Sequence, residues 1–308
     1  MIRTPPENLE ELEAWIEKKE DRVSDLRDSA RATIIWANQE RKKKTEYTLL
    51  YLHGFKACHP EGHPVHRQVA HHFGWNLFLA RLKGHGLTVK KPLSDFEVAS
   101  LKESAAQALE ISKRLGDKVI IMGTSTGGSL GLFLSAQPEL KEHIKALVLY
   151  SPLIEFYGIS QRLLGNRWGR SLLRFIPGGQ YLLKSDTSSK AENEIWYHTY
   201  ALNGALALGA FIQEWMKTST FRSVNAPLFT GFYYKNQREQ DKVVSVKAIK
   251  KMFREVGTSK PKKKLKNYPE AGTHVISSGL ISKSIPDITN DTIQFLSKNL
   301  VDIPPDMQ

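Results

Sequence analysis

The chain contains 308 residues, with 44 Lys and Arg against 32 Asp and Glu, which gives a formal net charge of +12. Hydrophobic residues make up 41% and charged residues 25%, which is typical of a globular protein and excludes a wholly disordered chain. A single cysteine excludes an intrachain disulfide framework and a cluster of metal-bound thiolates.

The excess positive charge is concentrated in three stretches. Two are short runs, Arg41-Lys42-Lys43-Lys44 and Lys262-Lys263-Lys264-Leu265-Lys266, each beside an apolar stretch that reads as a strand. The third consists of four spaced arginines: Arg162, Arg167, Arg170 and Arg174. Basic runs can mark nucleic-acid or anionic membrane surfaces, but short ones are usually solvated loops, and no nucleic-acid-binding motif accompanies them. We expect no nucleic-acid partner and at most peripheral contact with a membrane.

The ends of the chain and its most apolar segment predict no targeting or membrane-spanning element. Residues 1–22 are rich in Glu and lack the apolar core of a secretory signal. The most apolar segment, residues 201–212, is shorter than the roughly 20 residues that span a bilayer. These observations predict a cytoplasmic protein, and they leave the oligomeric state open.

The first half of the chain alternates between predicted strands and helices. Apolar residues at near-helical spacing predict an amphipathic helix over 9–27, which a short β-prone run at 32–37 follows. The alternating elements are then a strand at 47–52, a helix at 65–73, a strand at 76–82, a helix at 96–115, a strand at 119–122, a helix to 137 and a strand at 146–150. Uniformly apolar strands are buried on both faces, which indicates a parallel sheet covered by helices.

The alternation stops between about 154 and 222, where helical stretches and many aromatic residues replace the strands. It resumes with a strand at 226–232, a helix at 245–256, a strand at 263–268 and a helix at 288–300. We therefore predict an α/β core formed by residues 41–154 and 222–308, a helical cap, or lid, inserted at 155–221, and an N-terminal segment, 1–40, that packs on the core.

The sharpest motif is Gly123-Thr124-Ser125-Thr126-Gly127, which follows a buried strand and opens a helix. In this context the G-x-S-x-G pattern is typical of a nucleophile elbow, a tight turn that exposes the serine Oγ above the helix N-terminus. Gly123 and Gly127 leave room where side chains would strike neighbouring backbone. A plain helix cap or a phosphate loop is the alternative, but the chain has no G-x-x-x-x-G-K-[ST] string and fits a dinucleotide fingerprint poorly. Ser125 is the predicted nucleophile.

A catalytic serine needs a base and an acid that orients it, and on this fold the chain order is Ser, acid, His. Asp241 follows the strand at 226–232, and His274 follows the strand at 263–268, so both lie where α/β domains build their sites. Glu239 and Glu270 are rival acids. No other histidine follows the acid in sequence, so His274 is the predicted base and Asp241 the predicted orienting acid.

The oxyanion that forms during such a reaction needs backbone N–H donors. The predicted donors are Thr126, directly after the nucleophile, and Phe55, in the His53-Gly54-Phe55 loop after the first core strand. Gly54 allows the backbone to turn there without obstruction by a side chain.

With these residues assembled, the chain resembles an α/β-hydrolase of the esterase, lipase and monoacylglycerol-lipase group, which shades into serine aminopeptidases. The matching pieces are His53-Gly54-Phe55, Arg81-Leu82-Lys83-Gly84-His85-Gly86, the Ser125 motif, Asp241 before two valines, and Gly272-Thr273-His274. The resemblance implies the α/β-hydrolase fold, a helical lid over the serine, and no metal or organic cofactor. Thr126 departs from the Met, Gln, Leu or Ala that is more usual after the nucleophile.

The predicted function is hydrolysis of a carboxylic ester, lipid-like by this resemblance, through an acyl-enzyme on Ser125. Two alternatives stay open. An amide or peptide hydrolase needs an acidic anchor for the substrate amine, for which Glu61, Glu155, Glu192 and Glu194 are candidates. A non-catalytic binding protein of the same fold is the other, although it need retain none of the triad residues.

One weaker pattern is the loop with His59, His63, His66 and Glu61, which could suggest a metal site. It lacks Asp or a well-placed Cys to complete the ligand set, so we expect no metal and interpret the segment as a loop at the rim of the active site. Nothing in the sequence marks Cys58, in the same loop, as reactive.

Overall fold

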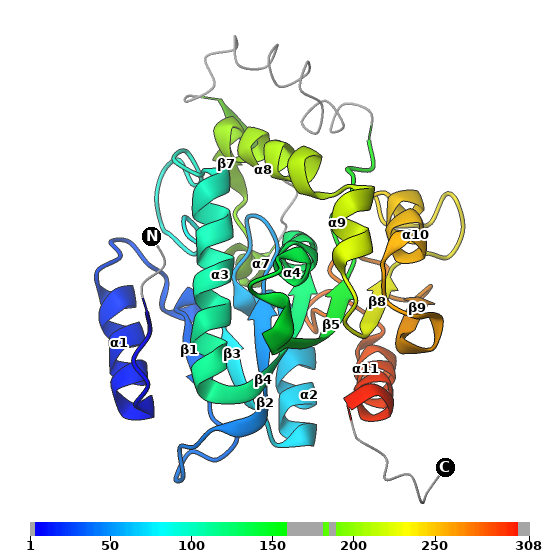
Figure 1. The fold of residues 1–308 in the computed structure, drawn as a ribbon. Coiled ribbons are helices and arrows are strands. Elements are labelled where there is room, and N and C mark those ends of the chain that lie inside the picture. The colour runs from blue at the N-terminus through cyan, green and yellow to red at the C-terminus, as the bar shows by residue number, and fades with distance from the viewer. Residues whose placement is uncertain (1–3, 159–180, 185–188, 301–308) are drawn as a thin grey trace, which may run out of the picture.

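The computed structural model describes residues 4–158, 181–184 and 189–300. A seven-stranded sheet lies at its centre, in the order β1-β3-β2-β4-β5-β8-β9 (Figure 1). All neighbouring strands pair in parallel except β1, which runs antiparallel to β3. The strands are β1 (Thr33–Ile35), β2 (Thr45–Leu52), β3 (Asn76–Leu79), β4 (Gly116–Thr124), β5 (Ile144–Tyr150), β8 (Leu228–Phe232) and β9 (Lys263–Asn267).

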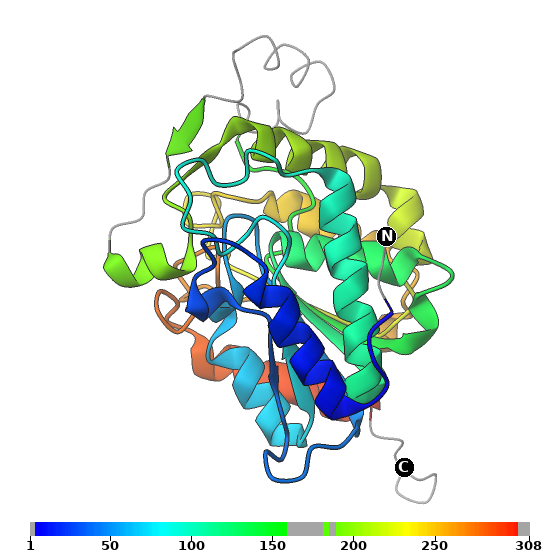
Figure 2. The same cartoon turned by 90° about the vertical axis from the view of Figure 1, so that its left-hand side faces the viewer.

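Helices cover both faces of the sheet, which gives the three-layered α/β architecture that the sequence predicts (Figures 1 and 2). On one face lie α2 (Val65–Phe73) and α11 (Ile285–Leu300), and on the other lie α3 (Val98–Leu115), α4 (Thr126–Ala136) and α10 (Val246–Glu255). Because side chains alternate along a strand, Ile121 packs into the core on the α3 side and Ile120 into the core on the α2 side. Both are fully buried, which explains why the central strands are apolar throughout.

Residues 181–184 and 189–223 lie over the carboxyl-terminal end of the sheet, with α8 along the top of the molecule (Figure 1). This segment is not wholly helical, because two short strands form a separate antiparallel sheet. Three-residue strands carry too little periodicity to be read from sequence. The elements are β6 (Leu182–Lys184), α7 (Lys190–Ile195), β7 (Thr199–Ala201), α8 (Leu202–Trp215) and α9 (Thr218–Ser223). The four arginines predicted to lie in the lid, Arg162, Arg167, Arg170 and Arg174, are outside the described residues.

The N-terminal helix α1 (Leu9–Asp21) packs beside α3 (Figure 2). A buried ion pair fixes it there, since Glu20 accepts two hydrogen bonds from Arg81, at 2.6 and 2.9 Å. The helix is shorter than predicted, because the chain after Asp21 leaves it to pair with the 86–88 loop. There the Arg27 N–H donates to the Gly86 carbonyl at 2.9 Å, and the Thr88 N–H donates to Asp25 at 2.7 Å.

The basic run at residues 262–266 lies largely on β9 itself rather than in a loop beside a strand. As β9 is the edge of the sheet, its lysines discourage pairing with another strand. Lys264 also forms an ion pair with Asp291 of α11, with an N–O distance of 2.7 Å. This part of the surplus charge therefore has a structural role. Among the described residues, no helix is both long and apolar enough to cross a bilayer.

Candidate active site

Ser125 occupies the turn between β4 and α4 in a backbone conformation that side-chain-bearing residues rarely adopt, with φ 54° and ψ −115°. Hydrogen bonds to the end of the neighbouring strand hold this turn. The Ser125 N–H donates to the Tyr150 carbonyl at 2.9 Å, and the Leu153 N–H donates to the Ser125 carbonyl at 3.0 Å. The strand–turn–helix geometry is that of a nucleophile elbow.

The two flanking glycines are needed because backbone approaches too closely for any side chain. A Cβ at Gly127 would lie 1.9 Å from the Leu52 carbonyl oxygen at the end of β2. A Cβ at Gly123 would lie 2.5 Å from the backbone of Gly127. The N-terminus of α4 therefore packs directly on the ends of two central strands, which places the Ser125 turn at the carboxyl edge of the sheet.

Asp241 and His274 lie together at the same edge. His274 Nδ1 donates to Asp241 Oδ2 at 2.7 Å, while Oδ1 accepts the N–H groups of Val243 and Val244 at 2.8 and 3.0 Å. Because Nδ1 carries this bond, Nε2 is left to accept a proton; in the described part of the chain that buried atom has no hydrogen-bond partner. Asp241 and His274 thus have the contacts of an orienting acid and a base.

The electrostatics of Asp241 agree with this contact. Burial of the carboxyl would raise its pKa, but the His274 ring and the N–H donors of Val244 and Val243 outweigh burial and lower the pKa below its ordinary value. The carboxylate is thereby kept ionised beside the imidazole.

Neither rival acid approaches His274 in this way. The side chains of Glu239 and Glu270 are 54% and 72% exposed, and both lie near the Lys235 ammonium group. Asp241 does not serve as the cap of the following helix, because the N-cap of α10 is Ser245, whose side chain accepts the Ala248 N–H at 3.2 Å.

The two predicted oxyanion donors border the Ser125 turn. Thr126 is the first residue of α4, so its N–H has no carbonyl to bind within the helix. The carbonyl of Gly54 accepts His53 Nδ1 at 2.9 Å and the Ala57 N–H at 3.3 Å. In a trans peptide the N–H points opposite to the carbonyl, so these bonds fix the direction of the Phe55 N–H.

His53 is held in one tautomer, which makes this orientation definite. Its Nε2 accepts the Leu82 N–H at 3.1 Å, so the proton must lie on Nδ1. Burial, together with the neighbouring His85, lowers its pKa well below the ordinary range, so the ring stays neutral.

A cavity of about 360 Å³ opens above Ser125, within the usual range for small-molecule sites. Ser125, His274, Glu61, Lys56 and Glu192 contribute polar or charged groups to its wall, and most of the remaining wall is apolar. Residues that line it include Phe55, Thr126, Leu153, Phe156, Trp196, Tyr200, Ala205, Leu208, Val243, Val275 and Ile281. Several of these come from residues 196–208, so the segment over the sheet forms the roof of the cavity.

Glu61, which the sequence offers as a possible amine anchor in a loop at the rim of the active site, does lie at this cavity, but its burial was not predicted. Its side chain is 1% exposed, yet it lines the same cavity. Burial raises its pKa to about 7, against the hydrogen bonds from Gly54 and Trp196 and the attraction of His274, which lower it. Its local sequence is that of a turn, so only the assembled fold reveals the contact. Of the other predicted amine anchors, Glu192 lines this cavity and Glu155 a different one.

The histidines around Glu61 are engaged with backbone. Nε2 of His59 donates to the Arg31 carbonyl at 2.9 Å, and Nε2 of His66 donates to the His59 carbonyl at 3.2 Å. Across the described residues, no three His, Cys, Asp or Glu side chains are grouped so as to hold a metal ion. Burial raises the pKa of the Cys58 thiol to about 12, which keeps it protonated.

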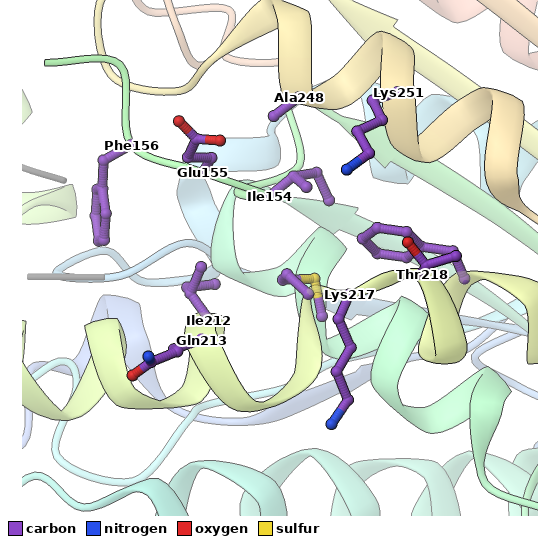
Figure 3. Close-up of a pocket in the computed structure, with 11 residues that line it drawn as sticks. Ile154, Glu155, Phe156, Ile212, Gln213, Lys217, Thr218, Ala248 and Lys251 are labelled. Atoms are coloured by element: carbon purple, nitrogen blue, oxygen red, sulfur yellow. The ribbon is translucent and has the colours of Figure 1, made fainter. Parts of the chain in front are cut away.

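A second cavity, of about 560 Å³, lies between α8, α9 and α10 (Figure 3). Phe156 lines both cavities, whereas Lys251 and Lys217 line only the second. Figure 3 shows Phe156 on one side of the second cavity and Lys251 on the other. Neither Ser125 nor His274 lines this space, so it lies apart from the predicted reaction centre.

A family model described as the alpha/beta hydrolase fold matches residues 47–243, which is more than half of the chain. The chain belongs to the α/β-hydrolase fold family. The match covers the Ser125 motif and Asp241 and ends before His274. No curated protein matches the sequence.

Many solved structures share the fold, and lipases and esterases are among them. One of the metagenome-derived lipolytic enzymes LipS and LipT aligns with a TM-score of 0.68 and 16% identity, over 89% of this chain and 99% of that one. A soluble variant of monoglyceride lipase from Saccharomyces cerevisiae gives 0.60 and 17%, over 88% and 92%. Est1E from Butyrivibrio proteoclasticus, with ferulic acid bound, gives 0.60 and 15%, over 87% and 94%. At identities this low, the structural likeness shows a shared fold alone.

Proposed function

We propose that this protein is a serine hydrolase that cleaves a carboxylic ester through an acyl-enzyme. Ser125 attacks the carbonyl carbon, and His274 takes its proton and then delivers it to the leaving alcohol. Asp241 orients the ring, and the Phe55 and Thr126 N–H groups bind the oxyanion. Water then attacks the acyl-enzyme with His274 as base, which releases the acid and restores Ser125.

The observation that carries the proposal is the convergence of separate segments on one cavity. Ser125 and His274 line it together with both predicted oxyanion donors, and His274 is bonded to a buried Asp241. The lipolytic enzymes and esterases among the structural neighbours support an ester as substrate. The apolar wall suits the acyl portion, and we infer that residues 155–221 act as a lid over it.

Short p-nitrophenyl esters test the reaction. We expect turnover by the wild type and a loss on the order of 10³-fold or more in kcat for Ser125→Ala, by analogy with subtilisin. Aminoacyl-nitroanilides provide the comparison for the amide alternative. Faster turnover of the anilides than of the esters would assign the protein to amide hydrolysis, and equal rates for the wild type and Ser125→Ala would overturn the serine mechanism.

A further inference from the structure

Glu61 is a buried acid that the triad and the predicted oxyanion donors do not use. It lies in a short turn, His59–Gly62, and faces the cavity that Ser125 and His274 line. Burying a carboxylate is costly unless donors surround it, so its contacts should identify its role.

One carboxylate oxygen holds the loop that carries the Phe55 N–H. Oε1 accepts the N–H of Gly54 and, at 3.4 Å, the Tyr51 hydroxyl. The carbonyl of the same glycine is already held by His53 and Ala57. Gly54 is thus fixed at both its N–H and its carbonyl. The glycine is also close to the nucleophile, since a Cβ built on it would lie 3.3 Å from the Ser125 Cβ.

The other oxygen holds a segment of the cavity roof. Oε2 accepts the indole N–H of Trp196 at 3.2 Å. Backbone bonds join the same two segments, because the Cys58 N–H donates to the Ile195 carbonyl at 3.0 Å and the Tyr197 N–H donates to Lys56 at 2.7 Å. The carboxylate therefore joins the oxyanion loop to Trp196 over the active site, a residue that lies 135 positions after Glu61 in the chain.

We propose that Glu61 is a positioning residue that couples residues 195–197 to the 53–58 loop, so that the Phe55 N–H is aligned with Ser125 while Trp196 is seated. This inference rests on the proposed function, since it assigns Glu61 a role in the same reaction. A carboxylate is required because each of its oxygens can accept hydrogen bonds, whereas an amide has only one acceptor atom. The alignment of the oxyanion donor then depends on how the roof of the cavity is seated.

The substitution Glu61→Gln breaks this link whichever way the amide turns. If its oxygen accepts the Gly54 N–H, its NH₂ group faces the indole N–H of Trp196; the opposite orientation places NH₂ against Gly54. We expect kcat on p-nitrophenyl butyrate to fall about 10- to 100-fold, with KM within about twofold. This loss lies below the 10²- to 10³-fold cost of deleting an oxyanion donor, because Phe55 is displaced rather than removed.

Trp196→Phe separates positioning from charge. It removes the N–H that Glu61 binds but keeps the carboxylate, whose field also acts on His274. We expect this variant to lower kcat in the same direction, about 3- to 10-fold, and Glu61→Gln/Trp196→Phe to be no slower than Glu61→Gln alone. Such non-additivity identifies two residues that act as one unit.

Matched controls change the same groups elsewhere. Glu214→Gln removes an exposed charge from α8, and Trp215→Phe removes an indole N–H that has no partner among the described residues. Both should retain wild-type kcat within about twofold.

A second readout does not require turnover. Hydrogen exchange followed by mass spectrometry should show faster exchange in peptides covering 53–58 for both Glu61→Gln and Trp196→Phe, and not for the controls. Unchanged kcat and unchanged exchange in these two variants, with an active wild type, overturns the coupling alone. If exchange changes in these two variants but the wild type has no esterase activity, the coupling stands and the proposed function is rejected instead. A rise in KM at constant kcat, or a lower Tm as the only effect, would assign Glu61 a merely structural role.

Discussion

Ser125 adopts a positive φ because the hydrogen bonds on either side of it fix the turn between β4 and α4 at that residue. Its N–H is bound by β5, its carbonyl is bound by Leu153, and α4 begins at the next residue. Backbone strain of this kind costs on the order of 1–3 kcal/mol for a residue with a side chain. The turn lifts the serine Oγ toward the cavity, so the fold sustains a local strain at the predicted reaction centre.

This strain can be measured by comparing two variants that both lack the nucleophile. Glycine adopts positive φ freely, although it loses more backbone entropy on folding than alanine. We expect Ser125→Gly to be more stable than Ser125→Ala by about 1 kcal/mol in the free energy of unfolding, measured with urea. An alanine variant that equals or exceeds the glycine variant in stability would show that the turn is not strained.

At the scale of elements, the predicted reaction centre lies where several strands end, and this is why its residues could be named from the sequence. Apolar strands alternating with helices indicate a parallel sheet, whose strands all end at one edge. The loops after β4, β8 and β9 carry Ser125, Asp241 and His274, and the fold brings Asp241 and His274 into contact. The rule of chain order therefore predicted a contact between residues 33 positions apart.

The parts that sequence did not predict depend on packing rather than on local pattern. Glu61 stands in a polar turn, and its carboxyl is buried between the end of β2 and Trp196, which comes from a distant segment. The strands β6 and β7 are three residues long, so they show no alternation. The early end of α1 at Asp21 follows from backbone bonds to the 86–88 loop, which is remote in sequence.

Phe156 lines both cavities, and this shared position predicts how acyl length is selected. Phe156→Ala should join the cavities and let a long chain extend from Ser125 toward Ile212. Burying each further methylene contributes about 0.8 kcal/mol, so two would raise the laurate-to-butyrate ratio of kcat/KM roughly tenfold. The p-nitrophenyl esters of the two acids give this ratio directly.

Ile212→Ala is the control for this prediction, because it enlarges only the second cavity. Its laurate-to-butyrate ratio should stay near that of the wild type. A ratio that is unchanged in Phe156→Ala, or that rises equally in both variants, would show that the second cavity does not receive the acyl chain.

For the whole molecule, Glu61 links stability to pH. Its pKa is raised from 4.5 to about 7 by burial, so the folded state holds the proton more tightly than the unfolded state. The stability that this proton contributes is complete below about pH 4.5 and is lost as the pH rises through about 7. The pKa difference of about 2.5 corresponds to roughly 3 kcal/mol at about 1.4 kcal/mol for each pKa unit.

Urea unfolding of the wild type and Glu61→Gln at several pH values between 4.5 and 8 tests this linkage. Relative to the wild type, the variant should gain roughly 3 kcal/mol in the free energy of unfolding across this range. The lowered pKa of Asp241 acts in the opposite sense, losing stability as the pH falls, but it is common to both proteins and cancels in the difference. If the free energy of unfolding changes with pH in the same way for both proteins, the claim that Glu61 titrates as a buried carboxyl is contradicted.

The molecule as a whole is an α/β-hydrolase whose predicted reaction centre lies under a largely apolar roof. One of the basic runs protects the edge strand β9. The formal net charge of the whole chain, +12, therefore gives no reason to favour nucleic acid over a small ester as the ligand.

The central claim is that Ser125 is a nucleophile activated by His274, and covalent labelling tests it most directly. After incubation with a fluorophosphonate, intact-protein mass spectrometry should show a single adduct on the wild type, and digestion should place it on the peptide that contains Ser125. Ser125→Ala should show none, and Asp241→Asn should label far more slowly because the ring loses its orientation. Wild-type protein that gains no adduct, or a Ser125→Ala variant that gains the same one, would contradict the account.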